Sequence, residues 1–169
     1  SERVVRALEA RLEGADPPEI VIVTPREQSG RLEQSTLGVL RARMVRRLKA
    51  ADRHGRLAIR SPVVGDRVGV NVHAKVMVVD DRLLRIGSAN LSNRSMRLDT
   101  ECDAAIEADD AATRRWIASV RDRLLAEHLG VRPERVRRVV AREGSLLAAL
   151  EIEPGEGRRL APLEPDVDA

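Results

Sequence analysis

The chain has 169 residues, of which 43% are apolar and 34% charged, so its size and composition fit one folded domain or half of a two-lobed protein. It has no Phe, no Tyr and one Trp, and 28 of its 30 basic residues are Arg, with a net charge of +3. The lack of Phe and Tyr excludes an aromatic platform for single-stranded nucleic acid, and the single Cys excludes a disulfide framework. No run of roughly 18 apolar residues, the length that spans a membrane, occurs in the sequence.

Apolar spacing and turn residues divide the first part of the chain into alternating helical and extended segments. Ser35 or Thr36 is expected to cap the second helix, and Gly55 to end it. The predicted elements are a helix over 3–13, a strand over 19–24, a loop over 25–34, a helix over 35–54, a strand over 57–60 and a turn-rich link over 61–69.

The second part of the chain predicts three strands followed by helices. Asp80-Asp81 is expected to form the turn between the first two strands, Gly130 to close the longest helix and Pro133 to begin the next. The predicted elements are strands over 70–79, 83–88 and 100–107, and helices over 110–129, 133–141 and 145–151.

This order of elements predicts an α/β fold, a mixed β-sheet flanked by helices. Two connections have the length of tight antiparallel turns, so the sheet is not expected to be wholly parallel. We expect residues 1–151 to form one lobe. Residues 152–169 are rich in Pro and acidic residues, and we expect a loosely ordered tail there.

The segment around His73 carries the strongest chemical signal. On a strand, His73 and Lys75 share a face, which places a titratable nitrogen beside a fixed positive charge. That pair suits an anionic substrate, and phosphate is the natural one. Asp80 has the opposite parity and lies at a turn, so we expect a structural carboxylate there.

The two following strands supply neutral and acidic groups. Gly87 permits close approach of the backbone to a ligand, and Ser88 and Asn90 offer hydrogen-bonding groups. Glu101 is expected to lie beside His73 and to orient its imidazole, with Asp103 as the rival carboxylate. His54 and His128 both lie near helix ends, where a structural role is expected.

Together these positions match the pattern His-x-Lys-x4-Asp-x6-Gly-Ser-x-Asn, which resembles the signature of the phospholipase D superfamily: His73, Lys75, Asp80, Gly87, Ser88 and Asn90. The flanking stretches GSANLSNRSMRLDTECDAAIE and RDRLLAEHLG resemble the second motif region of phospholipase-type members. The resemblance covers roughly residues 1–130 and is to the carboxy-terminal half of a bacterial two-motif protein. Arg31 stands where Trp is expected, which puts the contact made by that loop in doubt.

The resemblance implies one catalytic lobe of the phospholipase D fold over residues 1–151, with one motif per lobe, a phosphohistidine intermediate and no metal or other cofactor. It assigns His73, Lys75, Asp80 and Glu101 to catalysis and Lys75, Ser88 and Asn90 to phosphate binding. One His cannot be nucleophile and general acid at once. His73 is therefore expected to act as general acid/base, with the nucleophile on a missing N-terminal lobe or on a second copy, although the reverse assignment stays open.

The leading functional hypothesis is hydrolysis or transfer of phospholipid headgroups, at a cytoplasmic or peripheral membrane location. The alternatives are a nuclease-type phosphodiesterase working as a homodimer and an incomplete half-domain acting as an assembly module. Nucleic acid is the less favoured partner because the net charge is only +3. The basic stretch 41–60 is expected to be mainly a solvated face, with contact to acidic headgroups as the minority interpretation.

Four residues outside the defined motif positions have simpler expectations. Cys102 is expected to be a small buried residue, together with the other apolar residues of its strand face. Trp116 is expected to lie in the core. Asn93 and Arg94 are expected either to touch the phosphate or headgroup or to cap a loop.

Overall fold

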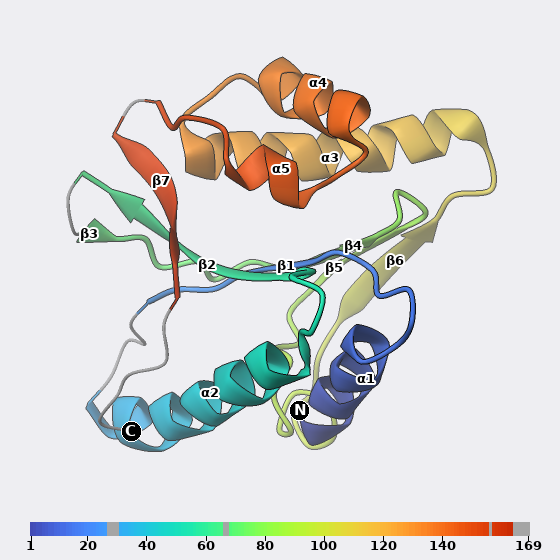
Figure 1. Ribbon diagram of the computed structural model, residues 1–169. Coiled ribbons are helices and arrows are strands. Elements are labelled where there is room, and N and C mark those ends of the chain that lie inside the picture. The colour runs from blue at the N-terminus through green and yellow to red at the C-terminus, as the bar shows by residue number, and fades with distance from the viewer. Residues whose placement is uncertain (27–30, 66–67, 156, 164–169) are drawn as a thin grey trace.

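A computed structural model describes the chain except for residues 27–30, 66–67, 156 and 164–169, together with the side chains of 31–37. The strands form a middle layer between two groups of helices (Figure 1). The elements, in chain order, are α1 (Glu2–Leu12), β1 (Ile20–Val23), α2 (Arg31–Ala51), β2 (Leu57–Val64), β3 (Val68–Gly69), β4 (Lys75–Val79), β5 (Leu83–Gly87), β6 (Asp103–Glu107), α3 (Ala111–Leu129), α4 (Pro133–Glu143), α5 (Leu147–Leu150) and β7 (Arg158–Pro162).

The strands form two sheets rather than one, and both are flanked by helices, which confirms the predicted mixed α/β class. In the first sheet β2 pairs in parallel with β1 and antiparallel with β3 and β7. In the second sheet, β4, β5 and β6 form an antiparallel meander. Tight connections suit antiparallel neighbours, whereas the parallel pair β1–β2 is joined through α2.

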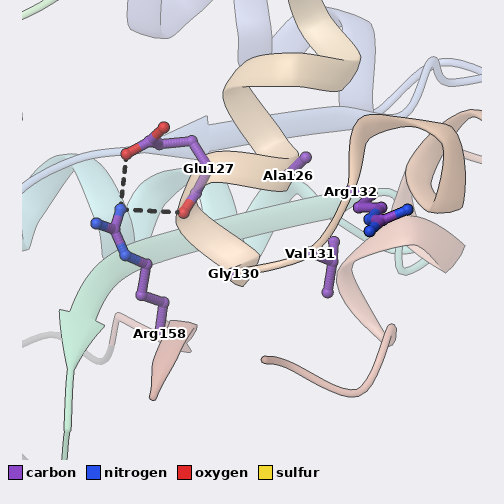
Figure 2. A pocket seen from close by; sticks show the side chains of 6 residues that line it. All are labelled: Ala126, Glu127, Gly130, Val131, Arg132 and Arg158. Atoms are coloured by element: carbon purple, nitrogen blue, oxygen red, sulfur yellow. Dashed lines mark hydrogen bonds and ion pairs between the residues drawn. The ribbon is translucent and has the colours of Figure 1, made fainter. Parts of the chain in front are cut away.

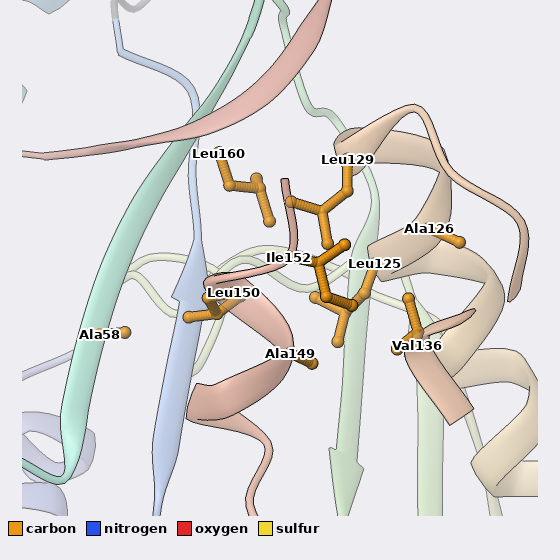
Figure 3. Packing of buried hydrophobic residues seen from close by; sticks show 9 residues of the cluster. All are labelled: Ala58, Leu125, Ala126, Leu129, Val136, Ala149, Leu150, Ile152 and Leu160. Atoms are coloured by element: carbon orange, nitrogen blue, oxygen red, sulfur yellow. The ribbon is translucent and has the colours of Figure 1, made fainter. Parts of the chain in front are cut away.

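The first sheet is covered on both faces. Neighbouring residues of β2 point to opposite faces, and each face packs against a different group of helices. Ala58 belongs to the cluster drawn in Figure 3, together with residues of α3, α4 and α5 that include Leu125, Val136 and Leu150. Ile59 faces the other way, into a cluster with α1 and α2. Burial on both sides explains why β1 and β2 read as nearly continuous apolar runs.

Helix α3 has well-defined ends. Asp110 accepts hydrogen bonds from the backbone N–H groups of Ala112 and Thr113, at 2.6 and 2.8 Å, and so caps its start. Gly130 ends it with φ of 62°. A Cβ at Gly130 would lie 1.9 Å from the carbonyl oxygen of Gly155, so only glycine fits both the conformation and this close approach.

Several predicted boundaries were wrong. Helix α2 begins at Arg31, so Ser35 and Thr36 lie inside it. Strand β2 continues to Val64 through residues predicted to be a link. The expected loose tail over 152–169 is folded where the structure describes it, since β7 pairs with β2 and buries Leu160. That strand forms through a partner about a hundred residues away, which local composition cannot reveal.

None of the described helices is long and apolar enough to cross a membrane.

A single carboxylate ties the chain before β1 to the start of α5. Glu19 accepts hydrogen bonds from the Ser145 hydroxyl at 2.7 Å and from the backbone N–H groups of Leu146 and Leu147 at 2.6 and 3.1 Å. Burial raises the pKa of Glu19, but these hydrogen bonds and the nearby Arg56 outweigh it and leave the pKa below the ordinary value of 4.5. Glu19 therefore stabilises the fold in its ionised form.

Replacing Glu19 with Ala should lower the free energy of unfolding by about 1–3 kcal/mol, because two partly buried backbone donors lose their acceptor. The contribution is fully present above the unfolded pKa and is lost as pH falls through the lowered folded pKa. Urea unfolding at pH 7 and at successively lower pH measures both effects.

Glu13→Ala is the matched control, since Glu13 is an exposed carboxylate at the end of α1. If the Glu19 variant unfolded at the same urea concentration as the Glu13 variant, the proposed capping role would be wrong.

Candidate functional site

The hairpin that carries the motif turns at Asp80 and Asp81. Both residues have positive φ, 51° and 54°, and the N–H of Arg82 donates to the carbonyl of Val79 at 2.9 Å. Two consecutive left-handed residues are the mark of the tight two-residue turn that matches the natural twist of a hairpin. Asp80 is exposed in this turn, at the opposite end of β4 from Lys75, so it does not join the other motif residues and its assignment to catalysis stays a prediction.

The strand register brings the other motif positions to one end of the meander. Lys75 pairs with Gly87 and Gly87 pairs with Asp103. The start of β4, the end of β5 and the start of β6 therefore meet at one edge, which we call the open end. His73, Ser88, Asn90 and Glu101 lie within three residues of these paired positions along the chain.

His73 and Lys75 are linked differently from the prediction. Strand β4 begins at Lys75, so His73 lies just before it, exposed, and does not share a strand face. Instead the Lys75 ammonium donates a hydrogen bond to the backbone carbonyl of His73 at 2.6 Å. This contact holds the positive charge of Lys75 close to His73, where both groups are open to an incoming anion.

Ser88 and Glu101 form a second pair at the open end. The Ser88 hydroxyl donates to Glu101 Oε2 at 2.5 Å and accepts from the backbone N–H of Cys102 at 2.9 Å. The N–H of Ser88 also donates to the carbonyl of Cys102 at 3.1 Å, which extends the β5–β6 pairing by one residue. The single O–H donor of Ser88 is thus engaged with Glu101, and one of its two acceptor lone pairs with Cys102.

Glu101 is not hydrogen-bonded to His73. Among the described residues, the side chains of His73 and Asn90 take part in no hydrogen bond. The orienting role of Glu101 and the phosphate-binding role of Asn90 therefore stay predictions. The structure brings the expected groups to one edge without closing the predicted His–carboxylate contact.

Only glycine fits at position 87, for a structural reason that the sequence did not suggest. A Cβ at this position would lie 1.7 Å from Oδ1 and 2.7 Å from Cα of Asp103, on the neighbouring strand. Asp103 is held there by Arg85, whose Nη2 lies 2.7 Å from Asp103 Oδ2. Arg85 was not among the predicted site residues. It lies diagonally across from Asp103, two residues from Gly87, and diagonal neighbours of opposite charge on antiparallel strands could have indicated the pair.

Asn93 and Arg94 hold loops in the structure. Asn93 Oδ1 accepts the N–H of Glu2 at 3.2 Å, and the Arg94 guanidinium bonds Asp99 at 2.9 Å. The carbonyl of Arg94 also accepts the N–H of Leu98 at 2.7 Å. These contacts favour the loop-capping interpretation over direct contact with a phosphate.

The expected burial of Cys102 was wrong, and Ala104 and Ile106 on the same strand face are also exposed. Helix α3 covers little of this face: Leu84 is buried against Ile117, whereas Ile106, its register partner on β6, is 39% exposed. Nearer the open end the apolar face is uncovered, and Ile86 is 47% exposed.

Trp116 was also expected in the core, but it is 44% exposed. Ile117 takes the buried position on α3, and one residue on a helix turns the side chain by about 100°. Trp116 therefore lies to the side of the face that contacts the second sheet.

The hollow shown in Figure 2 lies elsewhere in the fold, at the end of α3. It is lined by residues that include Glu127, Gly130 and Arg158, and none of the predicted site residues contributes to it. A search of the described residues finds no group of three His, Cys, Asp or Glu side chains placed to hold a metal ion.

Comparison with known proteins agrees with the motif. Residues 2–119 match the model of a family described as "Cardiolipin synthase, PLD-like domain". The chain is 35% identical over 99 residues to phospholipase D zeta 1 of Arabidopsis thaliana, a match that covers 52% of this chain and 9% of that protein. It is 35% identical over 78 residues to phospholipase D A of Dictyostelium discoideum, covering 38% of this chain and 6% of that protein.

The family match covers more than half of the chain, so the protein belongs to the PLD-like domain family of the phospholipase D superfamily. The matched region spans less than a tenth of the length of these curated relatives.

Replacing Gly87 with Ala should lower the free energy of unfolding by about 1–3 kcal/mol, because the new methyl group forces Asp103 away from the strand. Urea unfolding measures the change, and the amide shifts of β5 and β6 in an NMR spectrum show where the structure moves.

Gly38→Ala is the matched control. An added Cβ at Gly38, inside α2, meets no atom within 4 Å, so this substitution should be neutral or stabilise the helix by up to about 1 kcal/mol. Equal effects of the two substitutions would contradict the account of Gly87.

Proposed function

We propose that this chain supplies one of the two catalytic motifs of a phosphodiesterase of the phospholipase D type that hydrolyses or transfers phospholipid headgroups. The observation that carries the proposal is the convergence of His73, Lys75, Ser88, Asn90 and Glu101 at the open end of the β4–β5–β6 meander. Family membership and the similarity to proteins named phospholipase D support the class of reaction and of substrate.

Lys75 is proposed to bind a phosphate oxygen. Its ammonium lies beside His73, where a solvent-exposed hydrogen bond of 2.6 Å joins it to the carbonyl of that residue. An ammonium is a compact point charge with three donors, so it can keep this contact and still donate to a phosphate oxygen. Asn90, exposed at the same edge, is proposed to donate to a second oxygen of the phosphate.

His73 is proposed to act as general acid/base. In the first step a nucleophilic His on a second lobe attacks phosphorus, the bond from phosphorus to the leaving alcohol oxygen breaks, and His73 gives that oxygen its proton. In the second step neutral His73 takes a proton from water or from an acceptor alcohol. That oxygen attacks phosphorus and displaces the first His, which restores both groups.

The second His must come from outside the described site, because His54 and His128 do not lie at the open end. His54 follows the end of α2, and His128 lies in the last turn of α3, where burial lowers its pKa. We propose that the partner group lies on another lobe of the parent protein or on a second copy of the chain.

Ser88 is proposed to support Glu101 in its observed position. Its hydroxyl already donates to Glu101 and accepts from Cys102, so contact with a phosphate would require one of these bonds to be exchanged. The Glu101 carboxylate lies at the same edge as His73. We therefore propose that its negative charge stabilises the imidazolium form of His73.

His73→Ala should reduce hydrolysis of a generic phosphodiester, and of phosphatidylcholine in vesicles, by at least about 10²-fold, as loss of a general acid/base does. The measurement is release of the alcohol by the active assembly that contains this chain.

His54→Ala is the control, since this exposed His lies away from the open end and should leave turnover unchanged. Full turnover by the His73 variant would contradict the site assignment. Cleavage of DNA in preference to the vesicles would favour the nuclease alternative, and a monomer without turnover would favour the assembly module.

A further inference from the structure

Arg121, in the middle of α3, joins the turn of the motif hairpin to a buried carboxylate. One terminal nitrogen of its guanidinium pairs with Asp81 Oδ1, while Nε and the other terminal nitrogen lie 3.0 and 2.8 Å from Asp122 Oδ1. The Arg121 side chain is 17% exposed and that of Asp122 only 1%. None of these three residues is a defined position of the His-x-Lys-x4-Asp-x6-Gly-Ser-x-Asn pattern, although Arg121 and Asp122 open the flanking stretch RDRLLAEHLG.

The buried carboxylate fixes Arg121 in place. Asp122 Oδ2 receives no hydrogen bond, and its nearest partner is Nε of Arg137 on α4, at 3.8 Å. A buried charge that loses its partner is strongly destabilising, so Arg121 cannot swing away from Asp122 at low cost. Asp122 therefore holds the Arg121 guanidinium in a fixed position relative to α3.

The hairpin is equally rigid at its end of the contact. Asp81 has φ of 54° and is the second residue of a two-residue turn, so its backbone has little freedom to follow a moving partner. In Figure 1 the β4–β5 turn lies beside α3, as this ion pair requires. The contact thus joins two fixed elements.

The second sheet has few other attachments. Within the described chain, none of its strands pairs with a strand of the first sheet. Among the described residues, its contacts with the helices include a small apolar cluster around Leu84 and Ile117 and, in the loop after β5, the hydrogen bond from the N–H of Glu2 to Asn93 Oδ1. One ion pair at the turn therefore has a large share in setting the direction of the hairpin.

We propose that Arg121 is a positioning residue, which acts through Asp81 to fix the direction of the β4–β5 hairpin and with it the place of His73 and Lys75. The five residues of β4 carry any tilt at the turn to the open end, roughly 13 Å away. Misplacement of reacting groups by about 1 Å costs on the order of 10²-fold in rate. The catalytic consequence rests on the proposed function, whereas the anchoring of the hairpin does not.

Asp81→Asn is the most selective test, because Asn tolerates the left-handed backbone and leaves the Arg121–Asp122 pair intact. We expect amide hydrogen exchange in β4 and β5 to accelerate about tenfold or more, while the α3 residues packed in the first core keep their rates. In the active assembly kcat should fall about 10- to 100-fold with KM nearly unchanged, since the site is displaced rather than stripped of a binding group. Asp16→Asn, which removes the same charge from an exposed loop, should change neither.

A second set of variants removes the anchor from α3. Arg121→Gln alone strands the buried Asp122, so it is combined with Asp122→Asn to keep the chain folded. On that background Asp81→Asn should have no further effect on exchange or on kcat, because the contact it breaks is already absent.

Unchanged exchange in β4 and β5 of the Asp81 variant would overturn the proposal, as would an undiminished effect of Asp81→Asn on the doubly substituted background. Hydrogen exchange needs no turnover, so it separates this proposal from the proposed function. If His73→Ala kept full activity while Asp81→Asn loosened the hairpin, the function would fail and the anchoring would stand.

Discussion

The antiparallel register of β4, β5 and β6 is the constraint on which the candidate site depends. It places Lys75, Gly87 and Asp103 side by side, so residues up to thirty positions apart in sequence meet at one edge. A slip of one residue would turn every side chain to the opposite face of the sheet. The two-residue turn at Asp80-Asp81 and the absence of a side chain at Gly87 both fix this register.

The two sheets differ in how much of the core they form. The first is buried between two groups of helices and supplies most of the core, with Ala58 and Ile59 on opposite faces of β2. The second carries the motif and has only a small buried cluster centred on Leu84. Its exposed apolar face and its single His agree with a site that is completed by another lobe or copy.

The sequence predicted what depends on local rules. Short-range patterns predicted the Asp80-Asp81 turn, the end of α3 at Gly130, the start of α4 at Pro133 and the α/β class. The structure confirms all four. The strand order predicted that the motif residues lie on neighbouring strands, and the register places them at one edge without a hydrogen bond between His73 and Glu101.

What the sequence missed depends on partners far along the chain. Residues before Lys75 continue an alternating pattern, but β5 ends at Gly87, so they have no strand to pair with and His73 falls outside β4. Strand β7 exists only because β2 offers it an edge. Cys102 was expected in the core from the parity of its strand and Trp116 from helical spacing. Cys102 is exposed because α3 covers little of the second sheet, and Trp116 because Ile117 takes the buried position on α3.

The proposed phosphate site at the open end of the meander can be tested by titrating the isotope-labelled protein with millimolar inorganic phosphate and recording NMR spectra. We expect the chemical-shift changes to concentrate at Lys75, Ser88 and Asn90 and on the ring of His73. Changes concentrated instead along the basic segment 41–60, with the open end unaffected, would contradict this proposal.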